Sequence, residues 1–300
     1  MCHNEFVFGQ PPSINTPPFA LSVYRLIFPQ DPHTRSDTLP MDNSIVATMP
    51  QEMIDAIASH LYADGDWRSL GSFGLVQKAW LPSSRRYLFS DVSLNSSNVD
   101  AFLEILTAPD CIVAPYVGRL ELKQEHGKLL NKFLPYGQPL NAVKALVIEE
   151  LRWEDLIPEA EEILLSGFGG VTHLELDKPK FDSFNQFANF VTEFSSLELL
   201  SLTRGDWDED FGQPSCQVPE KSISTKLTSL KASVSSPCKR ELVKWLLCCL
   251  PVPAISAVDL QGITKDEAPA VRSLMRALGP ALHHLRLGFY IQITEGTPSY

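Results

Sequence analysis

Histidine and cysteine side chains are the first candidates for metal binding or nucleophilic chemistry in this sequence, which has seven histidines and six cysteines. No HxH, HExxH or CxxC pair occurs, so the spacings that bring ligands to one metal ion are missing. His283 and His284 are neighbours that would point to opposite faces of a strand. Cys248 and Cys249 lie in an apolar helical pattern, which indicates free thiols in a reducing compartment. We predict no metal site, no cofactor and no catalytic residue.

Two further stretches contain residue types that do chemistry but lack the geometry for it. The acidic run DWDED, from Asp206 to Asp210, lacks the spaced oxygen ligands and sharp glycine turn of a calcium loop, and we interpret it as a solvated loop. The sequence GFGG, from Gly167 to Gly170, precedes its strand, so its amides cannot bind phosphate as a dinucleotide-binding turn does. No GxSxG or Walker-type sequence is present. The chain is therefore not expected to be an enzyme.

Composition narrows the class of partner. The 300 residues are 44% hydrophobic and carry a formal net charge of -11, which argues against a broad surface for nucleic acid or anionic membrane. The longest apolar stretch near the start, Phe19 to Phe28, is shorter than the roughly 20 residues of a membrane span. We expect protein partners, no nucleic acid, no membrane, and a cytoplasmic or nuclear location.

The elements divide into three parts. Residues 1–44 contain a proline every few positions, which blocks long helices and central strands, and we expect a disordered or loosely attached arm. Between residues 49 and 89 we expect three short helices. The first has Met53, Ile54, Ile57 and Leu61 on one stripe and Pro50 in its first turn, and residues 66–76 and 78–89 supply the others. Residues 95–300 follow a different, repeating pattern.

Within residues 45–94, a set of positions carries a family resemblance: Met49, Pro50, Glu52, Ile54, Ile57, Leu61, Leu70, Leu75, Val76, Trp80, Leu88 and Phe89. This pattern resembles the F-box, the helical module that docks onto the Skp adaptor of cullin-RING ubiquitin ligases. The spacing agrees over about forty residues, and LPSSRRYLFSDVSL is similar to F-box proteins of mushroom-forming fungi; Met49 stands where the family has leucine. The resemblance implies binding of a Skp-type adaptor, and through it a cullin. The residues expected to contact the adaptor are Met49, Pro50, Ile54, Ile57, Leu61, Leu70, Leu75, Val76 and Trp80.

The third part repeats the frame apolar-x-x-apolar-x-apolar, which starts at residues 89, 117, 143, 171, 197, 227, 255 and 282. Helical patterns lie between these copies, at residues 99–106, 154–165, 184–194, 239–250 and 267–278. A short strand and a helix every 26 to 30 residues predict an α/β fold. We interpret it as an irregular leucine-rich-repeat solenoid, with parallel strands on the concave face and helices outside. A doubly wound α/β sheet is the alternative.

In this frame the apolar residues face the core and the residues between them face outward. The middle of the outward surface is acidic and apolar, and it predicts a client-binding strip for a basic protein segment. Its residues are Val147, Glu149, Glu175, Asp177 and Leu199. The F-box resemblance implies a substrate receptor of an SCF (Skp-cullin-F-box) ubiquitin ligase, which brings a client protein to the enzyme and has no catalytic residue. The alternative is a non-catalytic repeat scaffold that takes no part in ubiquitin transfer.

Overall fold

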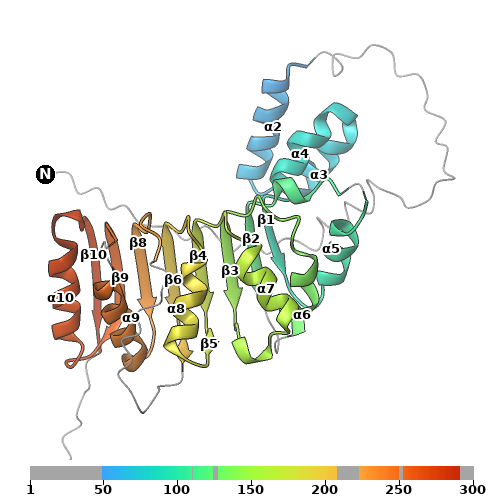
Figure 1. The fold of residues 1–300 in the computed structure, drawn as a ribbon. Helices are drawn as coiled ribbons and strands as arrows, with labels where there is room; N and C mark the ends of the chain where they lie inside the picture. The colour runs from blue at the N-terminus through green and yellow to red at the C-terminus, as the bar shows by residue number, and fades with distance from the viewer. Residues whose placement is uncertain (1–48, 110, 124–127, 208–222, 250–252, 291–300) are drawn as a thin grey trace, which may run out of the picture. The chain divides into compact units, whose positions relative to one another are not determined.

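The computed structural model describes residues 49–109, 111–123, 128–207, 223–249 and 253–290 (Figure 1). The expected arm, residues 1–44, and most of the DWDED run lie outside the described residues. The chain divides between Ser93 and Leu94 into two compact units, which we treat separately. No helix in these described ranges is long and apolar enough to cross a membrane.

The first unit is helical. It contains α2 (Gln51–Ala63), α3 (Trp67–Val76), the 3-10 turn η2 (Lys78–Trp80) and α4 (Leu81–Leu88). Pro50 precedes the first turn of α2, where its missing N–H costs nothing. The Asp66 side chain caps α3 by accepting a hydrogen bond from the backbone N–H of Ser69. These start signals explain why three helices fit into about forty residues.

Aromatic and aliphatic residues form the core of this unit. Ile54 and Leu70 are buried, and the rings of Phe73 and Trp80 lie 4.4 Å apart between centroids. Helices α3 and α4 approach closely at Gly74, where an added Cβ would lie 2.8 Å from the Ser84 hydroxyl. A glycine is therefore needed at that crossing.

The second unit is built on a parallel sheet. The order of the eight-stranded sheet is β1-β2-β3-β4-β6-β8-β9-β10, which follows the sequence apart from two short strands outside it. The strands are β1 (Asp91–Leu94), whose first three residues belong to the first unit, β2 (Arg119–Lys123), β3 (Ala145–Glu149), β4 (His173–Asp177), β6 (Leu199–Thr203), β8 (Ser229–Ser233), β9 (Ala257–Ile263) and β10 (His284–Phe289). Neighbouring strands from β2 to β10 pair in parallel and in register, with one shift between β9 and β10. The predicted α/β class is confirmed.

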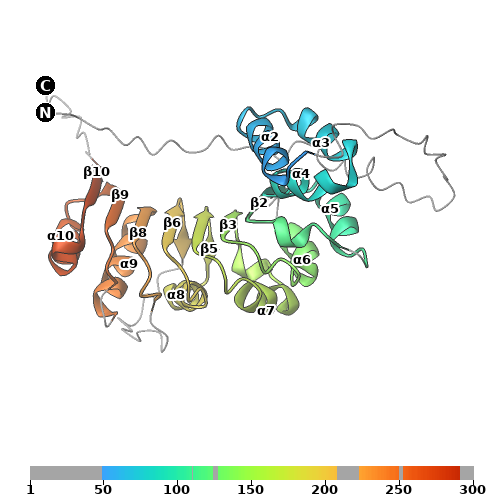
Figure 2. The ribbon, with the colours of Figure 1, turned by 90° about the horizontal axis from the view of Figure 1, so that it is seen from above.

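Helices lie along one face of this sheet, as Figure 2 shows from above. They are α5 (Val99–Leu106), α6 (Lys128–Phe133), α7 (Pro158–Ser166), α8 (Phe184–Thr192), α9 (Ser236–Cys248) and α10 (Ala268–Leu278). We call the surface they cover the helix face and the opposite surface the open face. A doubly wound sheet would carry helices on both faces, so the arrangement argues against that alternative.

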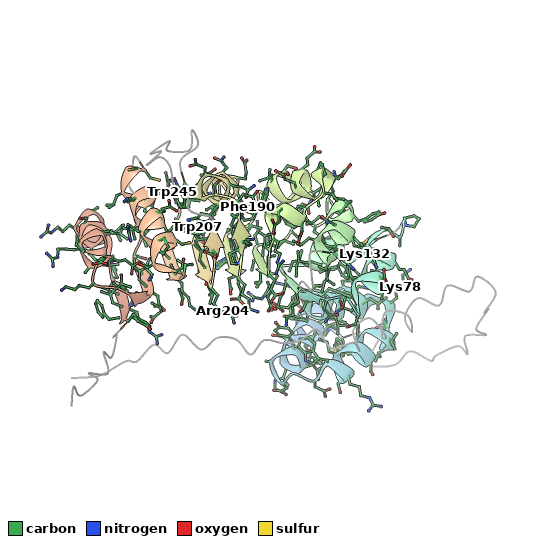
Figure 3. All side chains as sticks on the ribbon, turned by 90° about the horizontal axis from the view of Figure 1, so that it is seen from below. Lys78, Lys132, Phe190, Arg204, Trp207 and Trp245 are labelled. Atoms are coloured by element: carbon green, nitrogen blue, oxygen red, sulfur yellow. The ribbon has the colours of Figure 1, made fainter. Side chains whose placement is uncertain are left out.

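A second sheet, which the sequence did not predict, supports the helix layer. Strands β5 (Lys180–Phe181) and β7 (Asp206–Trp207) pair in parallel. Their aromatic residues pack with those of α8 and α9, and Figure 3 labels Phe190, Trp207 and Trp245 in this cluster. The rings of Phe187 and Trp207 stack with centroids 5.1 Å apart. Burial of these large side chains contributes much of the core between β4 and β8.

Each of three consecutive inner strands, β3, β4 and β6, is followed directly by a residue with left-handed backbone. Glu150, Lys178 and Arg204 have φ values of 58°, 51° and 56°. Their N–H groups donate to the last carbonyl of the next strand, from Glu150 to Asp177, from Lys178 to Thr203 and from Arg204 to Ser233, at 2.7 Å each. The conformation costs a non-glycine residue about 1 kcal/mol, which this hydrogen bond offsets.

Candidate interaction surfaces

The first unit leaves three large apolar side chains exposed. Met53 and Leu75 are each 53% exposed and Val76 is 52% exposed. Leu75 and Val76 form the last turn of α3, and Met53 lies in the first turn of α2. Single exposed apolar residues are ordinary, but three in so small a unit are typical of a surface that a partner covers.

The expected adaptor residues fall into three groups. Ile54, Leu70 and Trp80 are buried in the core of the unit. Met49, Ile57 and Leu61 are half-buried, and Pro50, Leu75 and Val76 are exposed. A partner reaches only the last two groups, so the buried three act by holding the helices together. Met53 was missed, although its place three residues after Pro50 puts it on an accessible side of the same helix.

A polar network fixes α2 against α4. Ser83 donates to Asp55 Oδ1 at 2.6 Å, and Gln51 Nε2 donates to the same oxygen at 3.0 Å and to the Ser83 hydroxyl at 2.8 Å. These hydrogen bonds, that of Ser83 first, lower the pKa of Asp55 below its usual value. The network orients the exposed start of α2, which includes Pro50 and Met53.

On the second unit, the open face carries the first, third and fifth residue of each five-residue strand. Register places Glu149 of β3 beside Asp177 of β4, and Val147 beside Glu175. Leu199 of β6 lies beside His173, in the row that begins each strand. The expected client-binding residues are therefore neighbours, although Val147 is buried and Leu199 is half-buried.

The charge of this region differs from the expected negative strip, because the chain supplies its own cations. Arg119 of β2 reaches across β3 to Glu175, with 3.3 Å between Nη1 and Oε1. Arg204 binds Asp177 through two nitrogens. Along the same edge Lys178 pairs with Glu150 at 2.7 Å. Glu175 and Asp177 are thus already neutralised.

Glu149 is the exception among the three predicted acids. In the described part of the chain it forms no ion pair. Its pKa is raised, first by burial and then by the negative charges of Glu121 and Asp177, while Lys123 acts in the opposite direction. Of the three predicted acids, Glu149 is therefore the one that could pair with a cation from a partner.

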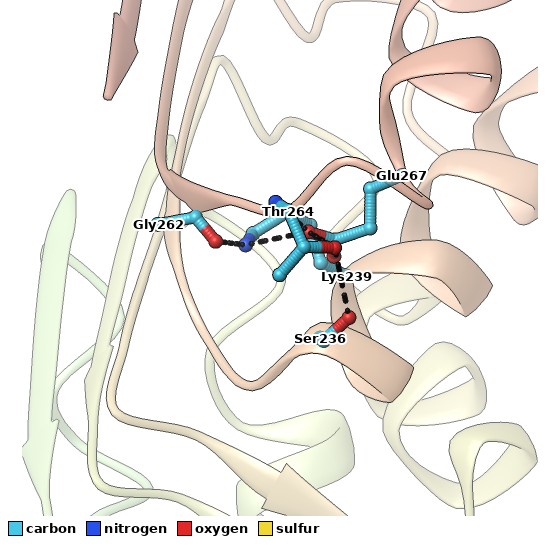
Figure 4. Close-up of polar contacts among 5 residues, drawn as sticks. All are labelled: Ser236, Lys239, Gly262, Thr264 and Glu267. Atoms are coloured by element: carbon cyan, nitrogen blue, oxygen red, sulfur yellow. Dashed lines mark hydrogen bonds and ion pairs between the residues drawn. The ribbon is translucent and has the colours of Figure 1, made fainter. Parts of the chain in front are cut away.

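A buried ion pair holds α9 against the start of α10 (Figure 4). Lys239 and Glu267 are each 1% exposed and lie 3.5 Å apart, and Lys239 Nζ also donates to the Gly262 carbonyl at 2.8 Å. Glu267 Oε2 accepts from the Thr264 backbone N–H at 2.7 Å and from the Thr264 hydroxyl at 3.0 Å, in the manner of a capping box. This group of residues stabilises the packing of α9 against α10 and is inaccessible to a partner.

Nothing in the described residues has the form of a catalytic or metal centre. No group of three or more histidine, cysteine, aspartate or glutamate side chains in those ranges could hold a metal ion. Burial raises the pKa of the Cys238 thiol to about 11, the opposite of what a nucleophile needs. No protein-family model matches the chain, and no curated protein sequence matches it. The candidate sites are therefore the two surfaces described above.

Proposed function

We propose that this chain is a substrate receptor of an SCF-type ubiquitin ligase, in which the first unit binds a Skp-type adaptor and the second binds a client protein. The chemistry of ubiquitin transfer belongs to the partners. The chain contributes effective concentration, because it holds lysines of the client near the charged enzyme that the cullin recruits.

The observation that carries this proposal is the helical unit itself. It resembles the F-box over residues 49–89, where Met49 and Pro50 match the start of that module, and its helices leave Met53, Leu75 and Val76 exposed. A self-sufficient small domain would bury such side chains, since it has little apolar surface to spare. An adaptor with an apolar groove would cover them.

We further infer that the second unit is a leucine-rich-repeat-like solenoid. Support comes from the sequential parallel strand order and from helices on one face only. In such a domain the open face is the available binding surface. Because Glu175 and Asp177 are paired within the chain, we now assign the attraction of a basic client chiefly to Glu149.

Copurification of the adaptor tests the proposal. We expect Met53→Asp with Leu75→Asp to reduce adaptor binding by at least about 100-fold, because each change replaces an apolar contact worth roughly 1.5 to 3 kcal/mol with a charge that must be desolvated. Both side chains are about half exposed, so the unit should stay folded.

The matched control is Tyr136→Asp with Ile157→Asp, two exposed apolar residues of the second unit at 52% and 40% exposure. This variant should bind the adaptor as the wild type does. If the Met53 and Leu75 variant keeps its helical circular dichroism and still binds fully, the adaptor does not use this surface. If the wild-type chain binds no Skp-type adaptor, the scaffold alternative replaces the proposal.

A further inference from the structure

The outer strand β10 exposes apolar side chains at positions where the inner strands bury theirs. At the register position of Leu285 on the helix face, the inner strands carry Val258, Leu230 and Leu200, which are at most 2% exposed. Leu285 is 49% exposed, and Phe289, which is in register with the buried Ile263, is 62% exposed. The apolar row of the sheet therefore continues to its edge without cover from the described residues.

The same residues carry the free backbone groups of that edge. The N–H groups of His284 and Tyr290 donate to carbonyls of Ser256 and Ile263, both at 2.9 Å, so the even-numbered positions face β9. Backbone direction alternates along a strand, so Leu285, Leu287 and Phe289 direct their N–H and C=O groups outward. The register shift does not disturb this alternation, because the extra residue lies in β9. In the described ranges β10 pairs only with β9.

We propose that a second copy of this chain docks on the β10 edge, with the two strands antiparallel about a twofold axis that passes beside Leu287. Leu287 then lies opposite its own copy, and Leu285 lies opposite Phe289 of the other copy. Every outward-facing backbone group finds a partner in this register, and all side chains on the helix face of the junction are apolar.

On the open face, Arg286 is the charged residue that the junction must accommodate. Arg286 lies opposite Gly288 of the second copy, so no like charges are directly opposed. On its other side Arg286 is in register with Asp259 of β9. A twofold contact uses the edge of both copies at once, so the assembly closes at a dimer. A second copy is favoured over an unrelated strand because it supplies its own apolar row, Leu285, Leu287 and Phe289, in this register.

Light scattering coupled to size exclusion tests the proposal on the full chain over a wide concentration range. We expect a dimer for the wild type, and Leu285→Glu with Phe289→Glu should raise the dissociation constant by about 100-fold or more, because charges enter the strip on both copies. Tyr136→Glu with Ile157→Glu makes the same type of change elsewhere and should leave the dimer intact. A wild type that stays monomeric at the highest concentration would overturn the proposal.

Cysteine crosslinking tests the register. Opposed residues of a hydrogen-bonded antiparallel pair have Cα atoms about 5.5 Å apart, within disulfide range, so Leu287→Cys should crosslink to its own copy under mild oxidation. Leu285→Cys should not, because in this register it lies about 14 Å from its own copy. The wild type gives the background from native cysteines, and equal crosslinking at both positions would refute the arrangement.

Removal of residues 291–300 separates a second copy from the chain's own tail as the occupant. Under the proposal the shortened chain still dimerises. If the full chain is monomeric and only the shortened chain dimerises, the tail occupies the edge and the proposal fails.

Discussion

Replacement of Lys239 by methionine should cost the second unit far more stability than loss of any exposed ion pair. The substitution keeps the long apolar stem but leaves the Glu267 carboxylate buried without its cation. Removing one partner of a buried pair typically costs about 3 to 5 kcal/mol. The Gly262 carbonyl also loses its donor, a loss that overlaps with this range. We therefore expect a decrease of about 3 to 5 kcal/mol in the free energy of unfolding.

The site makes the double variant informative. Glu267 Oε1 is buried and has no hydrogen-bond partner in the described part of the chain, so part of the cost of burying this group is not recovered even in the wild type. Lys239→Met with Glu267→Leu removes both charges and should lose less than the sum of the two single changes, with a coupling above about 1.5 kcal/mol. The Thr264 N–H would still lose its acceptor, so some destabilisation should remain.

Urea unfolding measures the free energy of unfolding of each variant. Hydrogen exchange with mass spectrometry, done separately, identifies the region that opens first. Faster exchange in peptides from residues 257–289 should accompany the loss of stability. Lys178→Met is the matched control, since its pair with Glu150 is roughly half exposed and should contribute less than about 1 kcal/mol. A Lys239→Met variant no less stable than this control would show that the buried pair contributes nothing beyond a surface pair.

Two predictions concern the titratable groups. Burial raises the pKa of Glu149 in the folded state above its unfolded value, so between these two pKa values the folded state binds more protons and stability falls as pH rises. Glu149→Gln should therefore be more stable than the wild type at neutral pH and have no advantage below about pH 4. A gain in stability that is independent of pH would contradict this cause. Cys238, with a pKa of about 11, should resist iodoacetamide at neutral pH in the folded chain, while the exposed Cys248 is labelled. Early modification of Cys238 in peptide mapping would show instead that its helix opens readily.

Long periodic elements could be predicted from the sequence, whereas short ones could not. The frame that starts at Val171 overlaps β4 (His173–Asp177), and the helix expected at residues 99–106 has those bounds in the structure. The pairing of β5 with β7 could not be predicted because each strand has only two residues, too few to show a hydrophobic period. Helix α6 (Lys128–Phe133) was missed for the same reason.

Side-chain roles were harder to predict than elements. Periodicity identifies Leu70 and Trp80 as apolar residues on helices, but it cannot distinguish a residue that packs within its own unit from one that packs against a partner. The electrostatics of the open face depended on Arg119, which binds Glu175 two strands away. That contact follows from the length of an arginine side chain and from register, neither of which a pattern of apolar residues contains.

The left-handed turns after the inner strands also determine where this domain tolerates changes in length. The strands begin at residues 119, 145, 173, 199, 229 and 257, so the length of a repeat varies from 26 to 30 residues. The register of the sheet nevertheless stays unbroken from β2 to β9. The hydrogen bonds from Glu150, Lys178 and Arg204 fix each strand to the next up to the turn, and the extra residues all lie beyond it. Peptide tags or evolutionary insertions placed after these turns would therefore enlarge the helix side of a repeat without displacing any residue of the open face.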